Sequence, residues 1–320
     1  TGFTRITRNV GSMNNQGIEI AANYRGNAGR DFQYGIGLTW STIKNKLTSI
    51  TSGTAFVTNL GGLVLNGFQG WDEFTRSYVG RPVGEFFGYK AIGIIQNKAQ
   101  IDDLNAKAGG IYYQALTGPG DRLFADLNGD KKVNSDDRVP IGNPQPKFFG
   151  GLSLDGTYRG WDINLYFYGS YGNKILNYVE SNLESFAKRG SEGADNVSQE
   201  YFAHHWTREG STDRYARALG NGGDNSTLNN VPSSVWIEDG SFLKLKNLSI
   251  GYTLPTSLLS KYSISKIRVY VSSQNLFVIT KYTGLDPEIG MQGGSATQNG
   301  VDNGTYPSSR FFTFGLNVTF

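Results

Sequence analysis

The chain has 320 residues, enough for one large domain or two ordinary ones, and its net charge of +3 gives no case for a nucleic-acid partner. It contains no cysteine, which excludes disulfides and cysteine metal sites. With 43 glycines, 9 prolines and 13% aromatic residues, the composition favours many strands over helices. The chain has no run of about 18 apolar residues, so no transmembrane helix is predicted. A transmembrane β-strand, however, needs only about 9–11 residues of alternating polarity.

The chain begins at Thr1 without a signal peptide, so we expect a mature product, a nicked chain or part of a longer polypeptide. Residues 1–16 are polar and without a pattern. Seven later segments alternate between apolar and polar residues, which is typical of strands. These predicted strands cover residues 17–25, 32–46, 147–158, 161–172, 242–254, 267–280 and 310–320. A register break is expected near Asn247.

The connections between these strands alternate strictly between short and long. Residues 26–31, 159–160 and 255–265 form short turns, whereas residues 47–146, 173–240 and 281–308 form long segments. Within the long segments we expect local hairpins in 85–95 and a short helix in 178–188. Outer-membrane barrels have short turns on one side and long loops on the other, so the pattern favours a transmembrane barrel. A soluble β-sandwich or propeller is the alternative.

The first long segment contains a row of oxygen-bearing side chains with the spacing of a calcium-binding loop. Asp126, Asn128, Asp130 and Asp137 occupy positions 1, 3, 5 and 12 of such a loop. Lys132 at position 7 would offer its carbonyl, and Asn134 at position 9 would bind through water. Lys131 replaces the usual glycine at position 6, and Asp137 replaces the usual glutamate. A turn rich in Asp and Asn without an ion is the alternative.

Two other groups of residues invite a functional interpretation. Aromatic residues in the long segments, which we expect to be exposed, could stack on a sugar or peptide ligand, or could pack the loops or meet a partner; they are Trp71, Phe74, Tyr112, Tyr113 and Tyr178. The only two histidines, His204 and His205, are adjacent, and we expect surface histidines beside a packed Trp206. The acidic residues that occur in pairs are sequence neighbours, and neighbours on a strand point to opposite sides of it. No catalytic carboxylate pair is therefore predicted, and the protein is not expected to be an enzyme.

Four stretches resemble the C-terminal part of SusC/RagA-type TonB-dependent outer-membrane transporters. They cover residues 80–90, 120–142 with 144–148, 238–248, and 274–277 with 282–288. The resemblance implies an all-β fold, in which about seven antiparallel strands form the C-terminal portion of a transmembrane β-barrel of about 22 strands with long extracellular loops. Residues 1–320 are then one barrel segment without the N-terminal plug domain.

The resemblance also implies a function and partners. The whole protein would be a multi-pass protein of the bacterial outer membrane that imports oligosaccharides or peptides, driven by TonB through the missing N-terminal region. A SusD-like surface lipoprotein would cover the extracellular loops, and the remaining strands would come from another chain or a further part of the same polypeptide. Phe320 would end the last strand as an assembly signal. The alternative is a secreted, calcium-stabilised β-sandwich that acts as a binding module or adhesin.

Overall fold

The computed structural model of the chain describes residues 11–50, 55–58, 71–184, 196–219, 228–291 and 294–320. Its main feature is a seven-stranded sheet in which all neighbouring strands are antiparallel. In order across the sheet these strands are β1 (Gly11–Ala28), β2 (Phe32–Ile50), β9 (Phe148–Tyr158), β10 (Trp161–Tyr171), β13 (Phe242–Thr253), β14 (Lys266–Thr280) and β16 (Phe311–Thr319). The predicted seven antiparallel strands are confirmed.

The first hairpin is longer than the sequence predicted. β1 begins at Gly11 rather than at residue 17, and β2 continues to Ile50 rather than ending at residue 46. The extension is polar and therefore shows no alternation, but its backbone pairs with β2 throughout. Side chains add to this pairing, because the Asn45 amide donates a 2.6 Å hydrogen bond to the Asn15 side chain. Backbone pairing alone can thus prolong a hairpin beyond its apolar part.

The expected register break in the fifth strand is confirmed. In the pairing of β13 with β10, the neighbours Phe167 and Tyr166 lie opposite Leu245 and Asn247, so Lys246 is the extra residue of a bulge. The pairing of β13 with β14 shifts at the same level, but there β14 contributes the extra residue. A bulge of this kind bends the strand and redirects the side chains next to it.

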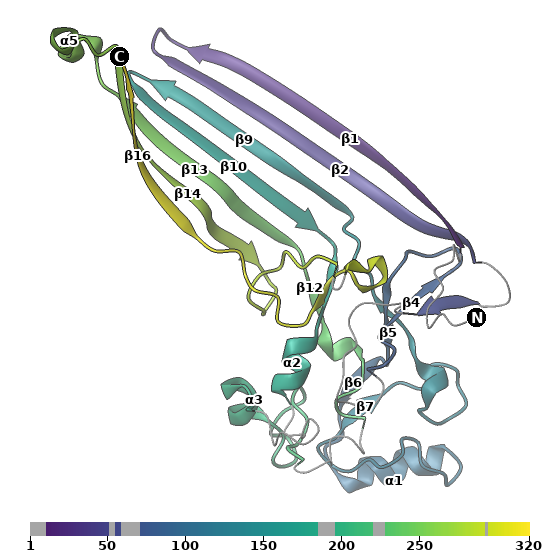
Figure 1. Cartoon of the computed structure of the whole chain (residues 1–320). Coiled ribbons are helices and arrows are strands. Elements are labelled where there is room, and N and C mark those ends of the chain that lie inside the picture. The colour runs from purple at the N-terminus through teal and green to yellow at the C-terminus, as the bar shows by residue number, and fades with distance from the viewer. Residues whose placement is uncertain (1–10, 51–54, 59–70, 185–195, 220–227, 292–293) are drawn as a thin grey trace, which may run out of the picture.

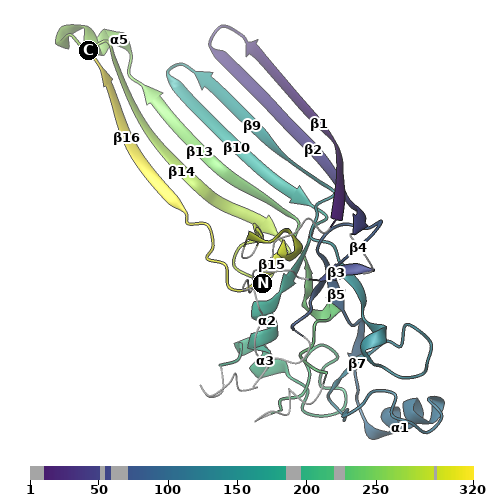
Figure 2. The ribbon, with the colours of Figure 1, turned by 45° about the vertical axis from the view of Figure 1, so that its right-hand side comes forward.

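The short and long connections lie at opposite ends of the sheet, as predicted (Figure 1). The three short turns lie at one end, together with the C-terminus and the short helices α5 (Thr256–Leu259) and η3 (Ser260–Tyr262). The three long connections extend from the other end (Figure 2). Among the described residues, no helix has both the length and the apolar character needed to cross a bilayer.

The long connections contain small sheets and short helices. One sheet has the order β3 (Phe56–Thr58), β4 (Thr75–Tyr78), β5 (Glu85–Gly88), β8 (Val139–Gly142). A second has the order β12 (Ile237–Asp239), β11 (Lys174–Asn177), β15 (Val301–Asp302), and a third pairs β6 (Ala91–Ile94) with β7 (Arg122–Phe124). The helices are α1 (Lys98–Lys107), η1 (Ser135–Asp137), α2 (Tyr178–Leu183), α3 (Gln199–His204), η2 (Ser234–Trp236) and η5 (Ala296–Gln298).

Two local expectations for these connections meet different outcomes. The helix expected in 178–188 is confirmed as α2, although residues 185–188 lie outside the described residues. The local hairpin expected in 85–95 is wrong, because β5 pairs with β4 and β8 while β6 pairs with β7. The pairing partners come from other parts of the long connection, which no local pattern could reveal.

The three long connections share one hydrophobic core. The core consists of Trp71, Phe74, Phe86, Leu176, Tyr178, Trp236 and Val301, all at most 2% exposed. The first three come from residues 47–146, the next three from 173–240, and Val301 from 281–308. Because no single connection could bury these large side chains alone, they fold as one unit. We call this unit, formed by the described parts of the three long connections, the loop domain.

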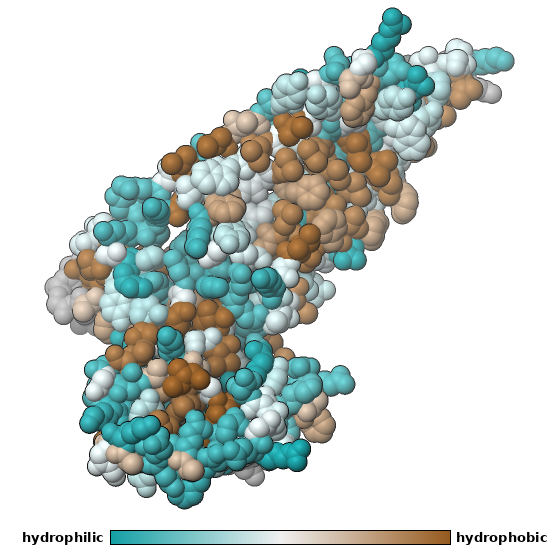
Figure 3. Space-filling model, turned by 180° about the vertical axis from the view of Figure 1, so that it is seen from behind, coloured by the Kyte–Doolittle hydropathy of each residue, from teal (hydrophilic) through white to brown (hydrophobic). Residues whose placement is uncertain are grey.

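The seven-stranded sheet has one apolar face and one polar face. Cross-strand partners lie on the same face, and the row Ile36, Leu154, Leu165, Leu248 is apolar across four neighbouring strands. The adjacent row, which faces the other way, contains Gly35, Asp155, Asn164, Ser249 and Ser272. Apolar side chains remain exposed on the first face, where Phe314 of β16 is 82% exposed. Figure 3 shows a continuous hydrophobic patch over the sheet.

Aromatic side chains border the apolar face at both ends. At the turn end Trp161 contacts Tyr252, with ring centroids 4.9 Å apart. At the loop end Phe148 stacks on Tyr171 at 5.1 Å, and Trp40 lies 6.3 Å from Phe148. The eleven residues from Trp161 to Tyr171 extend over about 33 Å of strand. At the tilt of about 35–45° of barrel strands, this length corresponds to roughly 25 Å, the height of an outer-membrane apolar band.

On the polar face, Tyr270 of β14 lies across Gly315 of β16, its cross-strand partner. A Cβ at residue 315 would overlap the tyrosine ring. We therefore predict that Gly315→Leu destabilises the sheet by about 1–3 kcal/mol, the usual cost of overpacking. The measurement is urea unfolding of the full-length protein in detergent micelles. Asn317→Leu, two residues along the same face, serves as the control.

A double variant tests the physical cause. If the tyrosine ring is the obstacle, Tyr270→Ala should remove most of the extra cost of Gly315→Leu. Equal costs for Gly315→Leu in the presence and absence of the Tyr270 ring would contradict this explanation.

Candidate functional site

The predicted calcium ligands Asp126, Asp130 and Asp137 come together in the loop domain. One carboxylate oxygen of each lies within 4.8 Å of the others. Two ligands that are each about 2.4 Å from one Ca²⁺ are at most about 4.8 Å apart, so this spacing is compatible with a shared ion. Asp137 is fully buried, and its carboxylate accepts hydrogen bonds from the Leu127 and Asn134 amides at 2.7 and 2.9 Å.

The backbone of this segment has the sharp turn that a calcium loop requires. Lys131 stands at the position usually taken by glycine, and its φ of 71° is the left-handed conformation for which glycine is suited. The Asp126 carboxylate supports the turn by accepting hydrogen bonds from the Gly129 and Lys131 amides at 2.6 and 2.8 Å. The replacement of glycine by lysine therefore leaves the geometry intact, at a cost in backbone strain of about 1 kcal/mol.

The other three predicted ligands line the same turn. The side-chain oxygens of Asn128 and Asn134 accept hydrogen bonds from the Asp130 and Asp136 amides. The ammonium of Lys132 lies 3.9 Å from an Asp130 oxygen, so its positive charge faces the cluster. All candidate ligand atoms are hard oxygens of the kind that Ca²⁺ prefers, which means that the residues present fit this ion.

The aromatic residues considered as ligand contacts divide into two groups. Trp71, Phe74 and Tyr178 are at most 2% exposed, so the expectation that they are exposed is wrong. They belong to the loop-domain core, and the Trp71 ring lies edge-on to Tyr178 at 4.7 Å. Tyr113 is half-buried and donates a hydrogen bond to the Phe124 carbonyl. Tyr112 alone among the five is freely exposed, at 76%.

The histidine segment is arranged as the sequence suggested, with His204 exposed at the surface and Trp206 partly buried. Both imidazoles lie near backbone carbonyls, His204 at 3.0 Å from Glu200 and His205 at 3.0 Å from Phe202. The neighbouring Trp206 donates to the Gln96 side chain. Neither histidine belongs to the acidic cluster found among the described residues.

The sequence reasoning missed a charged clamp between the sheet and the third long connection. Lys244 of β13 is almost fully buried and donates hydrogen bonds to Asp286 at 2.9 Å and to Glu288 at 2.6 Å. Lys246, the bulge residue, also contacts Glu288 at 2.6 Å. Although burial acts to raise it, hydrogen bonds from Lys244 and from two backbone amides hold the pKa of Asp286 at about 2. The clamp therefore keeps Asp286 charged and fixes residues 286–288 to β13.

A second missed feature is an ion-pair network inside the loop domain. Arg122 of β7 is buried and donates to Glu184 at 2.7 Å and to the carbonyls of Asn229 and Arg214. Its guanidinium also lies over the Trp236 ring, at 4.7 Å. These contacts join the first and second long connections, which are 62 residues apart at the Arg122–Glu184 pair. Removing one partner of such a pair leaves a buried charge uncompensated, which typically costs about 3–5 kcal/mol.

Glu180 on α2 extends this network, and the pKa of its carboxyl group is raised. Burial and the nearby Glu184 charge raise the pKa of Glu180 to about 8, although Arg214 donates to it at 2.6 Å. One Glu184 oxygen has no hydrogen-bond donor among the described residues. A protonated Glu180 would supply that donor. The arrangement indicates that the two carboxylates share one proton near neutral pH.

Together, the fold and these contacts define a class of protein. A twisted antiparallel sheet with one open apolar face, aromatic borders at both ends and long loops at one end is part of a transmembrane β-barrel wall.

Comparisons with known proteins identify the family. No family model matches the chain. Over its whole length, however, the chain is 33% identical to TonB-dependent receptor P3 of Formosa agariphila, and over 99% of its length it is 25% identical to TonB-dependent receptor SusC of Bacteroides thetaiotaomicron. It spans 30% and 27% of these two relatives. Its fold matches a structure of the RagAB peptide transporter with a TM-score of 0.70 at 21% identity, over 97% of this chain and 29% of that one. The chain belongs to the TonB-dependent receptors of the SusC/RagA type.

The shared proton leads to a prediction about pH. Because the folded pKa of Glu180 lies above its ordinary value of 4.5, the stabilisation that this proton gives is complete below pH 4.5 and is lost as the pH rises through about 8. One pKa unit corresponds to about 1.4 kcal/mol, so the loss should exceed about 1 kcal/mol. Glu180→Gln, which stays neutral, should remove this part of the pH dependence.

Thermal unfolding of the full-length protein and the variant at pH 5.5 and 8.5 provides the measurement. The stability difference between the two proteins should change with pH in favour of the variant at pH 8.5. Glu209→Gln, where the exposed glutamate accepts a hydrogen bond from the uncharged Asn97 side chain, should show no such change. The same absence of change for Glu180→Gln would disprove the shared proton.

Proposed function

We propose that this chain forms part of the wall of an outer-membrane barrel of about 22 strands that imports oligosaccharides or peptides. The observation that carries the proposal is the open apolar face with aromatic borders roughly 25 Å apart, which suits a lipid environment. The polar face then lines the hydrated interior. Its ion pair between Arg268 and Asp162, at 2.5 Å, is suited to water and polar solutes.

The comparisons support the energy source and the kind of cargo. The sequence relatives are TonB-dependent receptors, so import driven by TonB through a plug domain elsewhere in the full-length protein is the proposed mechanism. The matched structures are of a peptide transporter, which favours a peptide or a comparable polar oligomer. The secreted sandwich alternative is disfavoured, because a sandwich would cover the apolar face with a second sheet.

The loop domain is the proposed docking surface for a SusD-like surface lipoprotein. It lies at the end of the sheet opposite the short turns, which in this proposal is the extracellular end (Figure 1). Ile111, Tyr112 and Leu116 are each more than half exposed within six residues of one another. Exposed apolar and aromatic side chains close together are typical of protein interfaces.

The membrane part of the proposal can be tested with two lysine substitutions on β10. Leu165 lies on the apolar face near the middle of the strand, and Asn164 next to it lies on the polar face. Leu165→Lys should destabilise the full-length protein in lipid bilayers by about 2–4 kcal/mol, because a lysine would enter the bilayer core. Asn164→Lys should have little effect. Folding titrations in phospholipid vesicles measure both, and equal effects of the two substitutions would refute the proposal.

We also propose that Asp126, Asn128, Asp130, the Lys132 carbonyl, Asn134 and Asp137 hold one structural Ca²⁺. The mutual distances of the three carboxylates and the turn at Lys131 support this proposal. Millimolar Ca²⁺ should slow hydrogen exchange of the 126–137 amides in the full-length protein, and Asp130→Asn should abolish this effect. Asp102→Asn on the exposed surface of α1 is the control. Amide exchange that stays the same with Ca²⁺ and with a chelator would rule out the ion.

A further inference from the structure

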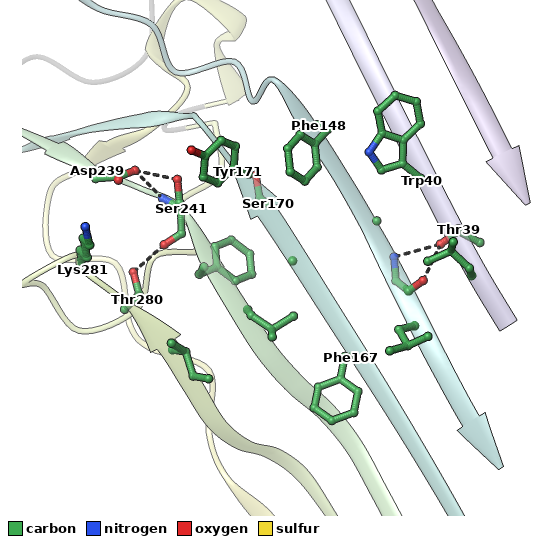
Figure 4. A pocket seen from close by; sticks show the side chains of 18 of the residues that line it. Thr39, Trp40, Phe148, Phe167, Ser170, Tyr171, Asp239, Ser241, Thr280 and Lys281 are labelled. Carbon is green, nitrogen blue, oxygen red and sulfur yellow. Dashed lines mark hydrogen bonds between the residues drawn. The ribbon is translucent and has the colours of Figure 1, made fainter. Parts of the chain in front are cut away.

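The apolar face of the sheet is not uniform, because a groove opens in it near the loop end (Figure 4). Gly150 of β9 and Gly169 of β10 are cross-strand partners, so the floor of the groove has no side chains at this level. The groove has a volume of about 910 Å³, at the upper end of the range of about 300–1,000 Å³ for small-molecule sites. The glycines cannot easily be replaced, since a Cβ at residue 150 would overlap the Thr39 carbonyl.

The walls of the groove are aromatic on one side and aliphatic on the other. Trp40, Phe148 and Tyr171 form the aromatic border that marks the loop-end edge of the apolar face. Leu243 and Ile279 stand on the opposite side and are 43% and 61% exposed. Elsewhere on this face, as in the row from Ile36 to Leu248, apolar side chains occupy every neighbouring strand. The groove is therefore a local depression shaped for a slender apolar chain.

Positive charge gathers where the groove meets the loop end. Lys281 lies at its end, next to Asp239, whose carboxylate is held by the Ser241 amide and hydroxyl (Figure 4). By strand alternation Lys44 and Lys46 share the face of Trp40 and lie beyond it toward the loop end. All three lysines are exposed, and none forms an ion pair within the described part of the chain. Lys281 is balanced by Asp239 and lies four strand positions from β2, about 19 Å across the sheet, so the net positive charge of this rim belongs to Lys44 and Lys46 on the Trp40 side.

We propose that the groove binds one acyl chain of a phosphate-bearing lipid, with the lipid phosphate near the Lys44–Lys46 pair. The inference rests on the proposed position of the sheet in a bilayer. Within a bilayer, apolar contact alone gives little preference, because every lipid offers the same hydrocarbon. Selectivity must come from the shape of the groove, which fixes the chain, and from the lysines, which attract an anionic headgroup. The site would thus hold an anionic lipid longer than the surrounding face does.

Native mass spectrometry of the full-length receptor tests the proposal. The receptor is equilibrated in detergent with equal amounts of phosphatidylglycerol and phosphatidylcholine, and the retained lipid is counted. We expect phosphatidylglycerol to be retained in preference. Leu243→Trp, which fills the groove with another apolar side chain, should reduce retention of both lipids. Leu316→Trp, on the same face of β16 but away from the groove, should leave retention unchanged.

A charge variant separates the headgroup from the acyl chain. Lys44→Gln should reduce the preference for phosphatidylglycerol about fivefold, the effect of one lysine worth about 1 kcal/mol near an anionic headgroup. Lys261→Gln at the turn end is the control. Equal retention by Leu243→Trp and Leu316→Trp, or no preference between the two lipids, would overturn the proposal. If both tryptophan variants still insert normally into the outer membrane, such a result overturns the lipid site and leaves the proposed barrel standing.

Discussion

The structure depends on one constraint, the pairing of backbone N–H and C=O groups in a sheet whose apolar face is open. In a bilayer each unpaired group costs several kcal/mol, so strands can cross only if their neighbours pair with them throughout. The continuous antiparallel ladder from β1 to β16 meets this requirement within the sheet. The outer edges of β1 and β16 have no partner strand among the described residues. In a membrane these edges require further strands, which accords with relatives more than three times as long as the region they share with this chain.

The loop domain solves a different problem, which is to fix three long polar connections in one conformation. A shared apolar core supplies most of the driving force, because it buries two tryptophans and several other large side chains from all three segments. Ion pairs then set how the segments meet. Arg122 and Glu184 join the first connection to the second, while Lys244 and the acidic pair Asp286 and Glu288 hold the third connection to the sheet. A domain fixed in this way offers a partner protein a defined surface rather than three independent loops.

The sequence predicted the sheet well and the loop domain poorly, and the reason is physical. A strand with one apolar face repeats every two residues, so alternation revealed all seven strands and the ends at which their connections lie. The core of the loop domain has no such period. Trp71 donates its hydrogen bond to the Asn230 carbonyl, 159 residues away, and nothing near Trp71 in the sequence indicates that it is buried. The candidate calcium loop was visible because its proposed ligands lie within twelve residues of one another, whereas the raised pKa of Glu180 depends on burial that only the fold reveals.

The central claim is that the sheet spans a membrane with the loop domain on the outside. Because this chain has no cysteine, single cysteines introduced at exposed positions at either end can report on it, with the unsubstituted full-length receptor as the labelling background. Tyr112→Cys lies in the loop domain and Lys261→Cys at the turn end. In intact cells that produce the full-length receptor, a membrane-impermeant maleimide should label the Tyr112→Cys variant and not the Lys261→Cys variant, with both labelled after the outer membrane is permeabilised. Equal labelling of the two variants in intact cells, or labelling of the Lys261→Cys variant alone, would contradict the account.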